Sequence, residues 1–107
     1  MSDSNVFDID KMRSSASDAS SLLKAMGHSE RLLLLCQLSQ KEMCVSDLAQ
    51  QLAIGQPNLS QQLGVLRRQN LVSTRKEGKH VYYSIADDNA LKILQTLYQL
   101  FCNNEGA

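Results

Sequence analysis

Residues 46–83 read SDLAQQLAIGQPNLSQQLGVLRRQNLVSTRKEGKHVYY, and this stretch decides the fold of the 107-residue chain. Leucines stand at helical spacing on both sides of a break at residues 54–56, and Pro57 follows where a first helical turn tolerates proline. The pattern then changes to β-branched and aromatic residues around a glycine-containing turn at residues 77–80. The stretch therefore predicts two helices and then two strands, over residues 46–53, 57–69, 71–76 and 81–85.

Two further helices are predicted on the N-terminal side. Apolar residues at helical spacing run from about residue 8 to residue 26 and stop at Gly27, which is expected to end the helix in the left-handed conformation. The second helix begins at His28 or Ser29, with Ser29 as the expected N-cap. Its residues 31–38 are nearly all apolar, so we expect it to be central, and a polar turn follows it.

A last helix is predicted after the second strand. Asp87 or Asp88 is expected to cap it, and apolar residues follow at spacings of three and four up to Phe101. The expected order is α-α-α-α-β-β-α, mainly helical with a β-hairpin, in one domain over residues 1–107 with a flexible tail over residues 1–8. Two helices joined by a tight turn and followed by a basic hairpin are the parts of a winged helix-turn-helix. In that fold the second helix enters the major groove of DNA and the hairpin, or wing, lies along the backbone.

The charge of the chain is unevenly distributed. The composition, 43% hydrophobic and 21% charged with a formal net charge of zero, is that of an ordinary globular protein. Residues 56–80 contain five basic residues against Glu77 alone, so this segment is net +4 and the remainder of the chain is net −4. A basic segment is what meets phosphate, so a neutral total does not exclude DNA binding.

No membrane association is expected. The longest apolar run, residues 32–36, has five residues, which is too short to span a bilayer. The polar, acidic N-terminus does not resemble a signal peptide, so we expect a cytoplasmic protein.

The helix over residues 57–69 is expected to turn its leucines inward and its polar side chains outward. Asn and Gln pair bidentately with adenine in the major groove, Ser contacts a base or a phosphate, and Arg and Lys contact phosphates. Exposed amides on a helix are usually only solvated and a basic hairpin is often only a polar surface, but their combination in this order favours double-stranded DNA. The residues expected to contact DNA are Gln56, Asn58, Ser60, Gln61, Gln62, Arg67, Arg68, Arg75, Lys76, Lys79 and His80.

Three segments resemble the ArsR family of repressors. Residues 23–32, LKAMGHSERL, are similar to that family's helix junction, residues 56–67, QPNLSQQLGVLR, to its recognition helix, and residues 71–83, LVSTRKEGKHVYY, to its wing. The resemblance covers residues 20–102, approximately, and implies a homodimer built from the first and last helices that leaves its operator when an inducer binds. Because a two-fold protein reads a two-fold site, we expect the operator to be an imperfect inverted repeat. Gln62 departs from the pattern, since many members carry His there.

The three cysteines bear on the inducer. Residues 42–48, EMCVSDL, resemble a metal-site motif of the family, but Ser46 stands in place of its second cysteine. The last helix also lacks the histidines of the family's other zinc site, so no metal or cofactor is expected. Cys36 and Cys102 instead resemble the sulfide- and redox-responsive members related to BigR, SqrR and HlyU, in which a cysteine in each of these two helices forms a dithiol switch. The resemblance implies that persulfide, polysulfide or another oxidant links Cys36 to Cys102 and releases DNA.

Several alternatives stay open at this level. Free cysteines are usually small buried hydrophobes, and a metal or metalloid sensor using Cys44 with other cysteines is the main competing interpretation. An enzyme is not expected, because the sequence has no Cys-x-x-Cys motif, catalytic triad, paired carboxylate site or phosphate-binding glycine loop. A protein-interaction module without DNA binding is a further possibility.

Overall fold

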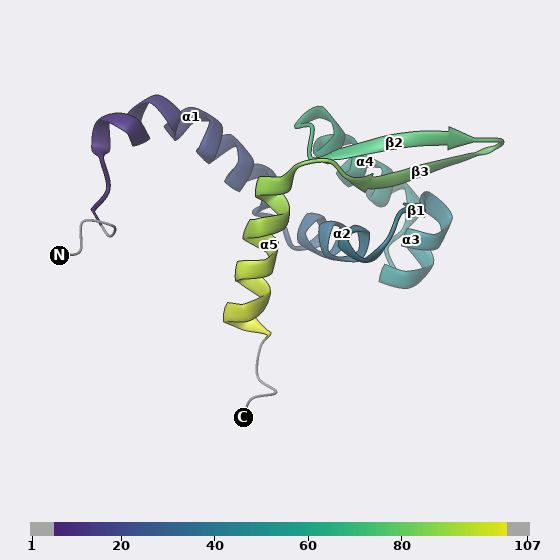
Figure 1. Ribbon diagram of the computed structural model, residues 1–107. Coiled ribbons are helices and arrows are strands. Elements are labelled where there is room, and N and C mark those ends of the chain that lie inside the picture. Colours follow the sequence, from purple (N-terminus) through teal and green to yellow (C-terminus); the bar gives the residue numbers. More distant parts are fainter. Residues whose placement is uncertain (1–5, 103–107) are drawn as a thin grey trace.

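The computed structural model describes residues 6–102, and residues 1–5 of the expected flexible tail lie outside them. The predicted winged helix-turn-helix, mainly helical with a β-hairpin, is confirmed. A body of α2, α3 and α4 carries the β2–β3 hairpin on one side, and α1 and α5 leave it on the other (Figure 1). In chain order the elements are α1 (Ile9–Met26), α2 (Ser29–Gln40), β1 (Met43–Cys44), α3 (Val45–Leu52), α4 (Gln56–Arg68), β2 (Val72–Glu77), β3 (His80–Ile85) and α5 (Asp88–Phe101).

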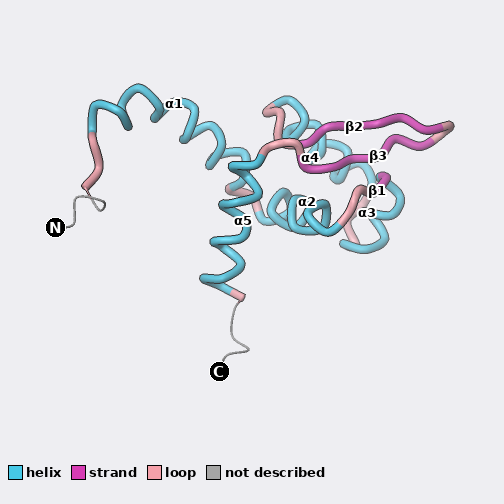
Figure 2. Tube along the Cα trace, in the orientation of Figure 1, coloured by secondary structure: helices cyan, strands magenta, loops and turns pink. Residues whose placement is uncertain are grey.

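The strand β1 was not predicted from the sequence. It pairs antiparallel with β3, with Met43 opposite Tyr83 and Cys44 opposite Tyr82, which gives the sheet order β1-β3-β2 (Figure 2). Two residues are too few for an alternating pattern to reveal a strand. The pairing joins the base of the wing to the segment that enters α3.

The core is built mainly from leucines of α2, α3 and α4. The leucines predicted to face inward from α4, namely Leu59, Leu63 and Leu66, are at most 1% exposed. They belong to one cluster with Leu34 of α2 and Leu48 of α3, both 0% exposed. Burying a leucine side chain stabilises a fold by about 2 kcal/mol, so this cluster holds the helix-turn-helix pair together.

Glycine does not supply the left-handed conformation at either of two turns, and the prediction of it for Gly27 is wrong. Gly27 ends α1 with φ −83°, which is not left-handed. A Cβ there would lie 3.2 Å from the carbonyl oxygen of Leu23, and this close approach explains the glycine. In the helix-turn-helix turn the left-handed residue is Ala53, at φ 56°, and Gly55 is the extended N-cap of α4. A left-handed alanine is strained by about 1 kcal/mol, so the packing of α3 and α4 must hold this turn.

The structure decides the two helix caps that the sequence predicted. The N-cap of α2 is His28 rather than the predicted Ser29, because the Nδ1 atom of His28 accepts a hydrogen bond from the backbone N–H of Glu30 at 3.2 Å. At α5, one of the two predicted caps is confirmed, since the carboxylate of Asp87 accepts a hydrogen bond from the backbone N–H of Ala90 at 2.9 Å.

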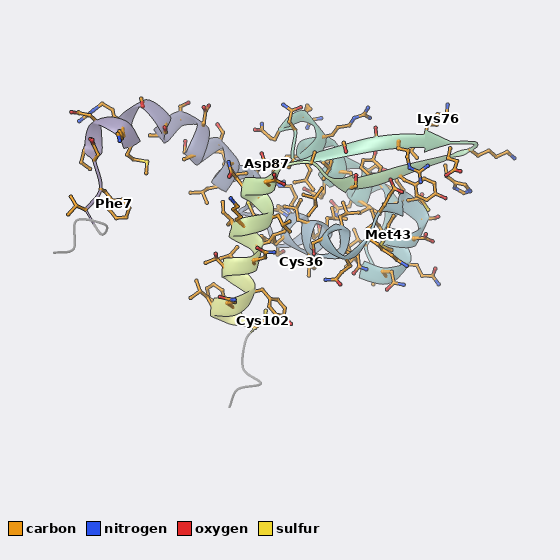
Figure 3. The ribbon with its side chains drawn as sticks, viewed as in Figure 1. Phe7, Cys36, Met43, Lys76, Asp87 and Cys102 are labelled. Atoms are coloured by element: carbon orange, nitrogen blue, oxygen red, sulfur yellow. The ribbon has the colours of Figure 1, made fainter. Side chains whose placement is uncertain are left out.

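The two outer helices leave large apolar side chains exposed. α1 stands clear of the body and buries only Ala25 and Met26 at its C-terminal end, while Phe7 lies near its far end (Figures 1 and 3). α5 packs on α2 and buries Ala90 and Leu94. Within residues 6–102, no helix is long and apolar enough to cross a membrane. The large exposed apolar residues in and beside these two helices are Val6, Phe7, Ile9, Met12, Leu23, Tyr98, Leu100 and Phe101.

Candidate nucleic-acid interface and cysteine site

α4 presents polar side chains on the surface that its buried leucines leave free. The amide and hydroxyl groups lie in its first two turns, where no acidic residue is found in the first turn, and two arginines lie in its last turn. The predicted site residues of this helix that are exposed are Gln56, Asn58, Ser60, Gln61, Arg67 and Arg68.

The expectation that Gln62 lies on the outer face is wrong, because this residue is 8% exposed. It stands three residues after Leu59 and four before Leu66, so it belongs to the same buried face. Its Oε1 atom accepts a hydrogen bond from Nη1 of Arg31 at 2.8 Å, and its Nε2 atom donates to Oδ1 of Asn58 at 3.1 Å. The helical spacing already placed Gln62 on this face, and only its polar character suggested otherwise.

Asn58 is exposed but already hydrogen-bonded at both ends of its amide. Its Nδ2 atom donates to Oε1 of Glu30 at 2.6 Å, and its Oδ1 atom accepts from Gln62. A base contact at Asn58 therefore has to share or replace a bond within the protein.

The tip of the wing carries exposed basic side chains. Lys76 lies toward the end of the hairpin (Figure 3), Lys79 lies in the turn beside Gly78, and both are exposed. Gly78 has φ +62°, the left-handed conformation that a tight hairpin turn requires. His80 is also exposed, and its ring centre lies 6.1 Å from that of Tyr82. A hairpin of this kind can reach the DNA backbone with little hindrance from the body.

Arg75 is held differently from the other wing cations. Its Nε and Nη2 atoms donate to Glu42 at 3.0 and 2.7 Å, its Nη1 atom donates to Glu77 at 2.7 Å, and its guanidinium lies 4.8 Å from the ring centre of Tyr82. The hydrogen bond from Arg75 lowers the pKa of Glu42, and the two carboxylates raise the pKa of Arg75. The charge of Arg75 is thus largely compensated inside the protein, which disfavours the predicted phosphate contact.

A groove of about 620 Å³ lies between α2 and α5, beside the place where the two helices pack together. Cys36 and Ser39 of α2 line one side, and Leu94, Tyr98 and Gln99 of α5 are among the residues that line the other. The lining is therefore mixed in character, with apolar side chains beside amide and hydroxyl groups.

Cys36 and Cys102 are both free thiols, and both residues are exposed. Cys102 is the C-cap of α5, where its backbone N–H donates to the carbonyl oxygen of Tyr98 at 2.8 Å (Figure 3). The competing interpretation of Cys36 as a small buried hydrophobe does not fit the residue as a whole, because it is exposed. Partial burial of its thiol nevertheless raises the pKa of Cys36, and the negative charge of the Cys102 thiolate raises it further. The negative charge on Cys102 therefore disfavours ionisation of Cys36.

Cys44 lies in a different environment. It is 6% exposed at the start of α3, and its Sγ atom lies 3.3 Å from the hydroxyl oxygen of Ser46. Across residues 6–102, no three side chains of His, Cys, Asp or Glu gather into a site that could hold a metal ion.

Three residues of this site were missed at the level of the sequence. Arg31 and Glu30 lie at the start of a nearly all-apolar helix. A cation in such a place needs hydrogen-bond partners, and this need could have indicated from the sequence that Arg31 binds other residues of the site. The partnership of Glu42 with Arg75 joins residues 33 positions apart and has no local signature.

Comparison with known proteins identifies the family. The family model for "Bacterial regulatory protein, arsR family" matches residues 28–74. The biofilm growth-associated repressor of Agrobacterium fabrum is 45% identical over 94 residues, which span 88% of this chain and 80% of that protein. The chain belongs to the ArsR family. It is a regulatory protein rather than an enzyme, as the sequence predicted.

Solved structures of ArsR-family regulators share the fold. BigR from Xylella fastidiosa matches with a TM-score of 0.85 and 41% identity, over 90% of this chain and 98% of that one. Reduced HlyU from Vibrio cholerae matches with a TM-score of 0.81 and 38% identity, over 86% and 97%. The resemblance to this family that three segments of the sequence indicated is therefore confirmed.

Proposed function

We propose that this ArsR-family protein is a homodimeric repressor that binds an imperfect inverted repeat in double-stranded DNA and leaves it when Cys36 and Cys102 are linked. The observation that carries the proposal is the position of the two thiols. Cys36 lines the groove between α2 and α5, and Cys102 ends α5 near enough to raise the pKa of Cys36. Of these two helices, α2 also packs against α4. A bond between the cysteines would thus act on the element that supports the recognition helix.

The DNA-binding part of the proposal rests on α4 and the wing. Ser60 and Gln61 are exposed in the N-terminal half of α4, and these side chains suit base edges or phosphates in the major groove. Lys76 and Lys79 on the hairpin suit the phosphates that flank the groove. The similar proteins of Agrobacterium fabrum and Xylella fastidiosa are described as repressors, which supports the same direction of control here.

The dimer is supported by the apolar surface of α1 and α5. Side chains such as Phe7 and Phe101 are 78% and 80% exposed, and large apolar side chains that gather on exposed helices mark a surface for interaction with a partner. A second copy would bring α1 and α5 of both chains together and cover these residues. Two recognition helices related by a two-fold axis then fit half-sites about one helical turn apart.

The proposed switch needs an oxidant, and we assign that part to polysulfide. The thiolate of Cys102 attacks a sulfane sulfur, an S–S bond of the polysulfide breaks, and a shorter polysulfide leaves, so that Cys102 carries two added sulfur atoms. The thiolate of Cys36 then attacks the first of these and expels hydrosulfide. The thiol pair loses two electrons and two protons overall, the polysulfide is reduced, and one sulfur atom bridges the cysteines.

The order of attack follows from the environment of the two thiols. Burial raises the pKa of Cys36 and so disfavours the thiolate that has to attack, and we therefore assign the first attack to the exposed Cys102 at the end of α5. A bridge with an added sulfur also spans more than the separation of about 3.8 Å between Cβ atoms that a simple disulfide requires. A coupling of about 3 kcal/mol between bridge and DNA would weaken binding on the order of a hundredfold.

The test is a DNA-binding assay on three matched serine variants with and without polysulfide. The parent protein is expected to leave DNA, whereas Cys36→Ser and Cys102→Ser remain bound. Cys44→Ser is the control, because Cys44 is buried and is not among the residues that line the groove, and it is expected to behave as the parent does. Mass spectrometry of the released protein counts the added sulfur atoms. Normal release of Cys102→Ser would contradict the dithiol switch, and loss of release in Cys44→Ser alone would move the sensor to that residue.

A further inference from the structure

A chain of hydrogen bonds joins the C-terminal end of α1 to α4. Arg31, at the start of α2, donates from Nε to the carbonyl oxygen of Ala25 at 2.6 Å and from Nη2 to that of Lys24 at 3.4 Å. Its Nη1 atom donates to Oε1 of Gln62 at 2.8 Å. One rigid guanidinium fork therefore binds two carbonyl groups in the last turn of α1 and one side chain of the recognition helix.

The amide of Gln62 continues this chain to the outer surface of α4. It donates to Asn58 at 3.1 Å, and Asn58 donates to Glu30 at 2.6 Å. Within residues 6–102, Gln62 is the buried polar residue of the core, and both ends of its amide are engaged. A buried amide is costly to leave without partners, so Gln62 favours the one placement of α4 in which Arg31 and Asn58 both reach it.

Packing between α1 and α4 is incomplete beside these hydrogen bonds. A hollow of about 280 Å³ lies there, with Ser21 and Lys24 of α1 on one side and Val65 of α4 on the other. Arg31 borders the same hollow. Close packing does not lock the two helices at this point, so the polar contacts through Arg31 carry the connection.

We propose that Arg31 and Gln62 form a positioning joint, which sets the orientation of α4 relative to α1 and thereby the distance between the two recognition helices of a dimer. The inference rests on the proposed function, because α1 has to belong to the dimer interface. Gln62 is in this view a positioning residue that touches no base. Loss of the Arg31–Gln62 contact displaces the two symmetry-related α4 helices in opposite directions. It therefore changes the preferred spacing of half-sites rather than the preferred bases.

The test uses operators with identical half-sites and a spacer that is varied one base pair at a time. Gln62→Leu places an apolar side chain of similar size in the core and removes both hydrogen bonds of the Gln62 amide. The parent is expected to prefer one spacer over its neighbours, and the variant is expected to lose on the order of fivefold of that preference for each of the two hydrogen bonds that contributes to it. Base preference within each half-site is expected to stay unchanged.

Two further variants separate a positioning role from a structural one. Arg31→Lys keeps the charge but loses the fork, so it is expected to weaken spacer preference as Gln62→Leu does. Gln61→Leu makes the same chemical change at the neighbouring exposed position, and it is expected to alter base preference while spacer preference is kept. Thermal unfolding measures the folded fraction of each variant.

The outcomes are distinct. If Gln62→Leu and Arg31→Lys lower affinity equally for every spacer, in step with lost stability, the positioning joint is overturned and the proposed function stands. If the parent protein itself binds no inverted repeat, the proposed function is overturned, and the joint falls with it.

Discussion

The two halves of the molecule differ in what they leave exposed. In the helix-turn-helix half, formed by α2, α3 and α4, leucines such as Leu34 and Leu59 are 0% exposed. In the outer half, formed by α1 and α5, Phe7 is 78% exposed, Leu100 71% and Phe101 80%. The first half is therefore held together by its own side chains, whereas the second presents apolar surface that a partner can cover. We infer that stability resides in the first half and assembly in the second.

The largest expected effect is on the free energy of unfolding in the buried half. Leu59→Ala removes a fully buried side chain of α4 and is expected to cost about 2–5 kcal/mol, measured by urea unfolding. Leu100→Ala makes the same change on α5, and its effect is expected to depend on protein concentration, because it acts through assembly. An equally large, concentration-independent loss at both positions would remove the distinction between the halves.

The next largest effect is expected on dimerisation through the outer half, α1 and α5. Phe101→Asp places a charge in the exposed apolar surface and is expected to weaken dimerisation by about a hundredfold, which corresponds to roughly 2.7 kcal/mol. Sedimentation equilibrium at micromolar concentrations measures the change. Asn89→Asp adds a charge to the exposed first turn of α5 and serves as the control with unchanged association. A parent protein that sediments as a monomer would contradict the prediction at once.

The wing allows a sharper comparison between two of its own cations. Lys79→Ala is expected to weaken binding to all sequences and to lower the slope of log affinity against log salt by about one unit, as one phosphate contact is lost. Arg75→Ala is expected to leave that slope nearly unchanged, because Arg75 is bound by Glu42 and Glu77. If Lys79→Ala changes neither affinity nor slope, the assignment of the wing to the DNA backbone is wrong.

The groove between α2 and α5, where the two halves meet, is expected to slow the reaction of Cys36 with alkylating reagents. Because burial and then the charge of Cys102 raise the pKa of Cys36, its thiolate forms only at higher pH than in an unstructured peptide. Below the pKa each pH unit lowers the thiolate fraction by about tenfold, so alkylation of Cys36 is expected to be slow at neutral pH and to rise steeply in alkali. Mass spectrometry of protein treated with iodoacetamide follows this. A pH profile identical to that of the peptide would contradict the burial of the thiol.

The smallest effect is expected at the contact between Glu42 and Arg75. The hydrogen bond from Arg75 lowers the pKa of Glu42 in the folded state, so the contact contributes stability above the unfolded pKa of about 4.3 and loses it as the pH falls through the folded value. Glu42→Gln is therefore expected to unfold at a slightly lower temperature than the parent at pH 7, and the difference is expected to shrink toward pH 3. A difference that grows on acidification would contradict this sign.

Much of the fold was accessible from the sequence because it depends on local periodicity. The spacing of Leu59, Leu63 and Leu66 fixes the buried face of α4 whatever the rest of the chain does, and the β-branched and aromatic residues of β2 and β3 predict the wing in the same way. The exposed amides of α4 followed from the same reasoning. Gln62 was misplaced only because its polarity was weighted above its position on that face.

The sequence by itself therefore determined the helices, the wing, the family and the location of the cysteines along the chain. Only the tertiary structure decided which side chains meet, including Arg31 with Gln62, 31 positions apart, and Arg75 with Glu42, 33 positions apart. Such pairs depend on how the elements pack, and packing is the sum of many weak contacts between distant residues that leave no periodic pattern in the chain.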